Sequence, residues 1–257
     1  MIRCSLFFLA FFLMTISAYA GHPLVTDDTG TQGKGKGQVE VGFSYFYDKN
    51  KMDELTTLKS DRGDVGVGIT IGALDTVDVV LRLPYAWYSL EENNVRIARE
   101  NGLSDIAFDV KWRFWEKGGW SLALKPGILL PSGDADKCIG IGRTGYRVFL
   151  IGSKEMTPVA FHVNAGYILN ENNWGERREI WHVSAAVECE IVDKIKLLFN
   201  IGTERCRLPH NENHPAFALG GISYDVSKKI TLDIGVQYGL TATEIDWTAL
   251  TGITVRF

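Results

Sequence analysis

The chain has 257 residues, of which 46% are hydrophobic and 23% charged, and its formal net charge is −4. A slightly negative chain with this hydrophobic content excludes a disordered protein and a nucleic-acid binder that works through a basic surface. Its 27 glycines and 11% aromatic residues favour β structure with many turns, in one large domain or two small ones.

The first twenty residues are predicted to be a cleaved signal peptide. Arg3 gives a basic start, residues 5–16 form an apolar run, and Ala18-Tyr19-Ala20 is a small-x-small site before Gly21. The run of 12 residues is too short for a spanning helix, although a retained membrane anchor is the alternative. No later segment has the roughly 18 continuous apolar residues that a spanning helix needs. An exported chain that stays in a membrane must therefore form a closed barrel.

Twelve later segments alternate between apolar and polar residues, as the two faces of a β-strand do. The clearest is DIAFDVKWRFW (105–115), in which the even positions are apolar or aromatic and the odd positions are mostly charged. The alternation slips only near Gly220-Gly221, where it predicts a bulge. The predicted strands are residues 38–48, 64–73, 78–87, 105–115, 120–131, 146–153, 159–169, 181–189, 195–204, 217–225, 230–240 and 246–257.

The connections between these strands alternate in length. Those after even-numbered strands are tight, such as LDT (74–76), whereas those after odd-numbered strands are mostly long and polar, such as residues 89–104 and 132–145. Short turns at one end and long loops at the other are typical of outer-membrane barrels, where the turns are periplasmic and the loops external. An even number of strands returns both termini to the periplasmic side.

Two architectures fit a strand with one aromatic and one charged face. A soluble sandwich would bury the aromatic residues, whereas a membrane barrel would turn them to lipid and the charges to its lumen. Aromatic residues recur near strand ends, where an interfacial girdle would lie: Tyr47, Trp87, Trp115, Trp120, Tyr167, Trp181, Tyr238 and Trp247. The predicted fold is therefore all-β, a single transmembrane antiparallel up-and-down β-barrel of about 12 strands over residues 38–257.

The opposite face supplies the candidate lumen-lining residues. It carries charges of both signs and two histidines, His162 and His182, which we expect to lie near each other on adjacent strands. The candidates are Glu40, Asp64, Asp78, Arg82, Asp109, Lys111, Arg113, Lys125, Arg147, His162, His182, Glu188, Lys196, Glu204, Asp233 and Arg256. In this orientation Phe108→Arg should destabilise the barrel by roughly 2–4 kcal/mol, whereas Asp109→Asn should barely affect it.

Three stretches resemble a known family. They are HPLVTDDTGTQGKGKGQVEVGF (22–43), LLPSGDADKCIGIGRTGYRVFLIGSKE (129–155) and FHVNAGYILN (161–170), and Pro23–Thr29 is the most specific part. The chain resembles the outer-membrane transporter family of the meta-pathway of phenol degradation over nearly all of its mature length. The resemblance implies an outer-membrane barrel of this size that passes small, often aromatic or otherwise apolar molecules.

Both ends of the mature chain have a predicted role. Residues 21–37 are polar and Gly-rich, and they either fold into the lumen as a constriction, with Asp27 and Asp28 facing lumenal Lys or Arg, or remain in the periplasm as a linker. At the other end, Phe257 closes an amphipathic strand and resembles the signal read by the outer-membrane assembly machinery.

Other motifs do not carry chemistry. GIGRTG (140–145) lies in a loop and leads into a strand, so it does not bind a dinucleotide, and GTQGKGKG (30–37) lacks the Ser or Thr of a P-loop. HNENH (210–214) places two histidines four apart but outside a helix, so no metal and no cofactor is predicted. Cys138 and Cys206 lie in predicted external loops, where a disulfide between them is possible.

The sequence is compatible with three functions. The first is a monomeric passive conduit for small uncharged or amphipathic solutes, with residues 21–37 as its gate. The alternative is a plugged structural or adhesive barrel that binds partners through its external loops. A lipid-modifying enzyme needs a serine or histidine site on the lipid face, and the sequence offers none there, so the protein is predicted not to be an enzyme. Its expected partners are outer-membrane lipid, the assembly machinery and an unidentified small solute, and no nucleic acid.

Overall fold

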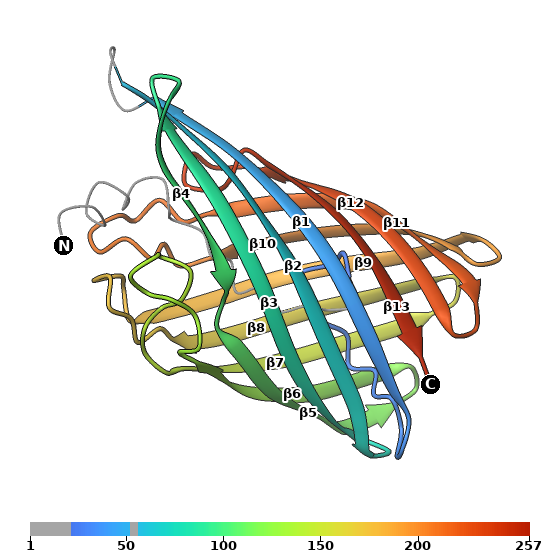
Figure 1. Cartoon of the computed structure of the whole chain (residues 1–257). Coiled ribbons are helices and arrows are strands. Elements are labelled where there is room, and N and C mark those ends of the chain that lie inside the picture. The colour runs from blue at the N-terminus through green and yellow to red at the C-terminus, as the bar shows by residue number, and fades with distance from the viewer. Residues whose placement is uncertain (1–21, 52–55) are drawn as a thin grey trace.

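The computed structural model describes residues 22–51 and 56–257, and the predicted signal peptide lies outside them. The described part of the chain contains thirteen β-strands and no helix (Figure 1). Among these residues, therefore, no helix is long and apolar enough to span a membrane. The strands are β1 (Gly37–Lys51), β2 (Thr57–Leu74), β3 (Val77–Glu92), β4 (Val95–Leu103), β5 (Ile106–Lys117), β6 (Trp120–Leu130), β7 (Gly145–Met156), β8 (Val159–Leu169), β9 (Glu179–Val192), β10 (Ile195–Glu204), β11 (Ala216–Ser227), β12 (Ile230–Gly239) and β13 (Trp247–Arg256).

The strands close into one antiparallel barrel. β1 pairs with β13 from Gln38↔Arg256 to Tyr47↔Trp247 on one side and with β2 on the other. β3 pairs with β5 up to Arg82 and with β4 from Tyr85 onward, so β4 and β5 run in the same direction along β3. Twelve strands therefore form the closed wall and β4 is an extension beyond it, which confirms the predicted barrel.

The prediction of a polar loop over residues 89–104 was wrong. β3 instead continues to Glu92, turns through Asn93 and Asn94, and returns as β4. Both asparagines have positive φ, 50° and 65°, which is the conformation that a two-residue hairpin turn requires and that Asn tolerates. β1 and β2 are extended in the same way, so these strands project past the rest of the wall (Figure 1).

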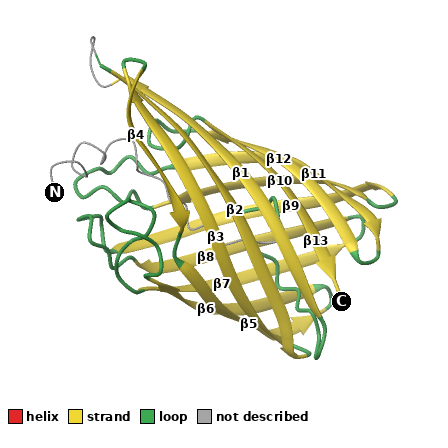
Figure 2. Ribbon diagram, viewed as in Figure 1, coloured by secondary structure: helices red, strands yellow, loops and turns green. Residues whose placement is uncertain are grey.

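The two ends of the barrel differ, as predicted. Five two-residue turns, at 75–76, 118–119, 157–158, 193–194 and 228–229, lie at one end together with the C-terminus, and we call it the turn end. Longer connections lie at the opposite loop end (Figure 2).

The predicted bulge at Gly220-Gly221 is also absent. The β11–β12 register shifts instead between Asp225 and Ser227. A Cβ on Gly220 would meet nothing within 4 Å, whereas one on Gly221 would lie 3.1 Å from Pro23 Cγ. Gly221 therefore marks a close approach of the N-terminal segment to the strand, which is the other common reason for glycine in a strand.

The barrel is apolar outside and polar inside, as strand β5 shows. Phe108 and Trp112 are 40% and 49% exposed, whereas Asp109 and Lys111 are 1% and 8% exposed. This arrangement is the inverse of a soluble sandwich and fits a wall that faces lipid.

Part of the interior is nevertheless filled with apolar side chains. Phe149, on β7, occupies the space beside Gly166, and Phe217, on β11, occupies the space beside Gly202. A Cβ on Gly166 would lie 2.3 Å from the Phe149 ring, and a Cβ on Gly202 would lie 2.6 Å from the Phe217 ring. These two lumenal glycines therefore accommodate packed aromatic rings.

Candidate functional site

Residues 22–36 lie inside the barrel and enter it from the turn end, ahead of β1. The backbone at the base of this N-terminal segment pairs with β2, because Gly35 N donates to Gly72 O and Gly72 N donates to Lys36 O, both at 2.9 Å. The segment then crosses the lumen toward β6, β7 and β10. Of the two paths that the sequence left open, the structure has the lumenal one.

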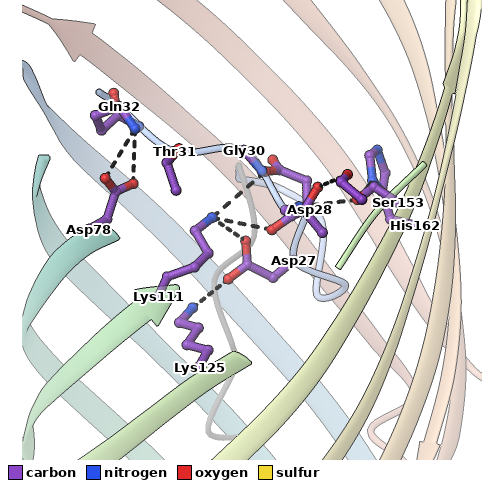
Figure 3. A network of polar contacts seen from close by, with 12 residues as sticks. Asp27, Asp28, Gly30, Thr31, Gln32, Asp78, Lys111, Lys125, Ser153 and His162 are labelled. Carbon is purple, nitrogen blue, oxygen red and sulfur yellow. Dashed lines mark hydrogen bonds and ion pairs between the residues drawn. The ribbon is translucent and has the colours of Figure 1, made fainter. Parts of the chain in front are cut away.

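Asn200, on β10, binds the first half of the segment. Its Oδ1 accepts hydrogen bonds from Val25 N at 2.7 Å and Thr26 N at 3.0 Å, and its Nδ2 donates to Thr26 Oγ1 at 2.7 Å. Further hydrogen bonds run from Thr29 N to Ser153 Oγ (3.1 Å) and from Gln32 N to both oxygens of Asp78 (3.1 and 3.0 Å) (Figure 3). Lys34 N donates to Asp75 Oδ1 at 3.1 Å. The segment is thus held by side chains from strands across the barrel.

Asp27 is the charged centre of this contact. Its two carboxylate oxygens lie 2.5 Å from Lys125 Nζ and 3.1 Å from Lys111 Nζ, and all three side chains are at least nine-tenths buried (Figure 3). Asp28 is more exposed and lies 3.7 Å from Lys111 Nζ. The predicted meeting of Asp27 and Asp28 with lumenal lysines is therefore what the structure has.

The start of the segment fits against glycines in the wall. His22 Nδ1 lies 2.5 Å from Asp233 Oδ1, and a Cβ on Gly42 or Gly252 would lie 2.8 Å or 2.7 Å from the His22 ring. Pro23 similarly occupies the space beside Gly221 and Gly235. Only residues without a side chain allow the segment to lie this close to the wall.

The predicted lumen-lining residues fall into three groups by burial. Ten are buried, five are half-buried, and Arg256, at the turn end, is exposed and donates to Thr231 Oγ1 at 2.8 Å. The buried group is Asp78, Arg82, Asp109, Lys111, Lys125, Arg147, His162, His182, Glu204 and Asp233, and the half-buried group is Glu40, Asp64, Arg113, Glu188 and Lys196.

The two lumenal histidines are not neighbours. In the β8–β9 register His162 is opposite Ala186, whereas His182 is opposite Gly166, four residues further along β8. His162 contacts Ser153 at 2.8 Å and Glu188 at 3.7 Å, and His182 lies 3.6 Å from Glu204. Each histidine therefore belongs to its own polar contact, which corrects the expectation that they lie together.

Two cavities lie in the lumen on either side of the N-terminal segment. The turn-end cavity, of about 750 Å³, has mixed polar walls that include Asp28, Lys196 and Arg256. The loop-end cavity, of about 180 Å³, has mostly apolar walls. Three residues line both, namely His22, Glu40 and Arg82, and they therefore form the boundary between the cavities.

The loop between β6 and β7, residues 131–144, folds inward over the loop-end cavity. Asp105 accepts hydrogen bonds from Gly133 N at 2.9 Å and Ile141 N at 2.6 Å, and Ser104 Oγ donates to Ile139 O at 2.6 Å. Ile139 and Ile141 are consequently buried. Sequence reasoning missed this role of Asp105, because its partners lie 28 and 36 residues further along the chain.

The disulfide considered between Cys138 and Cys206 is not present. Both residues are buried, each within its own loop, and the structure has no bond between them. Cys206 N donates to His214 Nδ1 at 3.3 Å within the β10–β11 loop, and the ring of His214 packs edge-on against Trp181. Among the described residues, no group of three or more His, Cys, Asp or Glu side chains is placed to hold a metal ion.

Comparison with known protein families identifies the family of this chain. Residues 20–257 match the family described as "Putative MetA-pathway of phenol degradation". The chain belongs to this family. No curated protein sequence matches it significantly.

Solved structures share the fold at low sequence identity. An outer membrane channel from Pseudomonas putida F1 is 11% identical, with a TM-score of 0.70 over 90% of this chain and 98% of that one. The β domain of the Bordetella autotransporter BrkA is 13% identical, with a TM-score of 0.59 over 87% and 100% of the two chains. The KdgM porin is 8% identical, with a TM-score of 0.54 over 86% and 99%. Members of this fold thus include channels, porins and autotransporter domains.

Proposed function

We propose that this protein is an outer-membrane barrel that acts as a passive conduit for small uncharged or amphipathic molecules. It is exported through a cleaved signal peptide, residues 1–20, and works as a monomer without a cofactor or energy source. The outward apolar face and the contrast between the turn end and the loop end support this location. The observation that carries the conduit is the pair of lumenal cavities that meet at His22, Glu40 and Arg82.

The gate of this conduit is the N-terminal segment, residues 22–36. Its polar contacts to wall side chains are hydrogen bonds and ion pairs, chiefly with Asn200, Lys111, Lys125 and Asp78, while Leu24 packs in an apolar cluster of wall residues. Such polar contacts can be exchanged for water one at a time when the segment moves. The lumenal charges are of both signs, so we do not expect strongly selective conduction of inorganic ions.

An enzymatic role is less well supported. Ser153 Oγ lies 2.8 Å from His162 Nδ1, and His162 Nε2 lies 3.7 Å from Glu188 Oε1. This order resembles the nucleophile, base and acid of a hydrolase. However, Ser153 Oγ also accepts a hydrogen bond from Thr29 N, and Ser153 and His162 are both buried beneath the N-terminal segment. We therefore assign this group to anchoring of the segment.

A plugged barrel that binds partners through its loops is the second candidate. It is favoured by the inward fold of loop 131–144 and by the N-terminal segment, which obstruct the lumen from opposite ends.

Solute uptake into liposomes separates the two candidates. Purified mature barrel, a variant lacking residues 22–36 and protein-free liposomes are compared for uptake of benzyl alcohol. A conduit makes uptake faster than in protein-free liposomes, and the deletion accelerates it further. If neither form differs from protein-free liposomes, the conduit is refuted and the plugged barrel is supported.

A further inference from the structure

The loop-end cavity combines apolar walls with guanidinium groups. Four arginines are among its lining residues: Arg62, Arg82, Arg147 and Arg207. Two of these are nearly fully buried, since Arg147 is 6% exposed and Arg207 is 2% exposed. Each of the two has one buried nitrogen, Arg147 Nη1 and Arg207 Nη2, for which the described residues provide no hydrogen-bond partner.

The remaining nitrogens of these two side chains are engaged. Arg147 donates from Nε and Nη2 to the two oxygens of Asp109, at 2.8 and 2.7 Å. Arg207 donates from Nε to Glu204 Oε1 at 3.3 Å, and its Nη1 lies 3.8 Å from Glu176. Asp109 thus holds the Arg147 guanidinium along one edge, and Glu204 and Glu176 contact Arg207 at two different nitrogens. In each side chain the remaining nitrogen lacks an acceptor among the described residues. Buried donors are rarely left in this state.

The same cavity is also lined by small or apolar residues. Gly66, Gly68, Pro84 and Ala86 line the cavity from β2 and β3, and Ile139 and Ile141 line it from loop 131–144. A cavity of about 150 Å³ with apolar walls can hold one benzene molecule. The loop-end cavity, at about 180 Å³, therefore suits one ring and a small substituent.

We propose that the loop-end cavity is a binding site for a small amphipathic carboxylate. The apolar body packs against the glycine, proline and isoleucine wall, and the carboxylate accepts hydrogen bonds from Arg147 Nη1 and Arg207 Nη2. This inference rests on the proposed conduit and names the class of solute that it takes.

The alternatives match the site less well. An uncharged hydrocarbon fills the apolar space but leaves both guanidinium nitrogens unpaired. A positively charged amine is disfavoured, because four arginines line the cavity and only three carboxylates do, those of Glu40, Asp64 and Asp105. Of these, Asp105 is already occupied by the N–H groups of Gly133 and Ile141. A carboxylate satisfies the donors, and its charge-assisted bonds to arginine are stronger than neutral ones.

Binding is tested on the purified mature barrel in lipid nanodiscs, which avoids detergent that would compete for an apolar cavity. Equilibrium dialysis at pH 7 compares three probes with the same ring: benzoate, benzyl alcohol and benzylamine. We expect benzoate to bind roughly tenfold more tightly than benzyl alcohol, since hydrogen bonds to a charged group are worth about that factor or more, and benzylamine to bind most weakly.

Variants connect this preference to the two arginines. Arg207→Gln should lower the preference for benzoate to within about threefold while leaving benzyl alcohol binding unchanged. Arg147→Lys keeps the charge beside Asp109 but removes the planar fork, and it should reduce the same preference if Arg207→Gln fails to fold. Arg256→Gln is the matched control, because Arg256 lines only the turn-end cavity, and it should bind as the parent does.

Equal binding of benzoate and benzyl alcohol to the parent would overturn the proposal, as would an unchanged preference in folded Arg207→Gln or Arg147→Lys. These results leave the conduit itself standing if benzyl alcohol still enters liposomes through the barrel. Conversely, selective benzoate binding without any uptake would support the site and refute the conduit.

Discussion

Asp27 and Lys125 form a buried ion pair, with 2.5 Å between Oδ2 and Nζ, that joins the N-terminal segment to the wall of the barrel. Lys111 shares the same carboxylate at 3.1 Å, so one carboxylate of the segment bridges two lysines of the wall. Removal of one partner from a buried pair is costly, because the remaining charge is left without compensation.

Asp27→Asn should therefore release the segment. We expect the free energy that docks residues 22–36 to fall by roughly 3–5 kcal/mol, so that the segment becomes accessible to protease and benzyl alcohol uptake rises. Limited proteolysis and liposome uptake measure these two effects. Asp28→Asn is the control, since the Asp28 side chain is more exposed and its carboxylate lies further from Lys111 Nζ, at 3.7 Å. Equal effects of both substitutions would contradict this account of Asp27.

Gly72→Ala should open the gate from its base. A Cβ at Gly72 would lie 1.9 Å from Gly33 O, so the segment must move away from β2. Gly220→Ala is the matched control on β11, because nothing lies within 4 Å of its Cβ. We expect faster uptake and faster proteolysis of the segment for Gly72→Ala alone, and equal behaviour of the two variants would show that the segment does not close the lumen.

The two faces of β5 should respond differently to substitution. Phe108→Arg places a charge on the outward face and should cost roughly 2–4 kcal/mol, whereas Phe108→Leu should cost much less. For Asp109→Asn the structure changes the expectation: Asp109 is 1% exposed and binds Arg147 through both oxygens, so we expect a loss of about 3 kcal/mol. Urea titration of the refolding equilibrium in lipid vesicles measures both values, and a neutral Asp109→Asn would contradict the pair.

The loop between β12 and β13 should be sensitive to pH. Burial of Glu244, together with the nearby carboxylate of Glu204, raises its pKa from 4.5 to about 8. Because the pKa is raised on folding, the folded loop favours the protonated acid, and its stability is fully present below pH 4.5 and is lost as the pH rises to about 8. Hydrogen-exchange protection of the Ile245 amide, which donates to Glu244 Oε1 at 3.2 Å, should fall over this interval. Glu244→Gln should abolish the dependence, and a constant protection factor in the parent would contradict it.

The strands and their faces were predictable because each strand carries its own signal. In β5 the alternation from Ile106 to Phe114 identifies the strand, and the exposed aromatic residues identify the lipid face. The β3–β4 hairpin was missed because Asn93-Asn94 sits in a run of charged residues without alternation. The turn is instead fixed by the pairing of Glu91 with Arg96 and Glu92 with Val95.

The path of the N-terminal segment was not predictable from its own residues. Its position depends on Gly42, Gly221, Gly235 and Gly252, which belong to four separate strands and become one surface only in the closed barrel. The partners of Asp105 could not be predicted for the same reason, because they come from loop 131–144. Nor could the separation of Cys138 and Cys206, which lie in loops that fold separately. A single sequence holds no record of which distant residues meet.

The β3–β4 hairpin gives a practical way to determine which end of the barrel faces the surroundings of the cell. Asn93 and Asn94 are exposed and form the two-residue turn between β3 and β4. The tip of this hairpin lies beyond the closed wall and away from the C-terminus (Figure 1). An epitope inserted between them is displayed on a stiff arm, whereas a tag joined directly ahead of His22 begins within the lumen. Antibody staining of intact cells that carry the insertion therefore reports the topology directly, without disturbing the segment on which permeation depends.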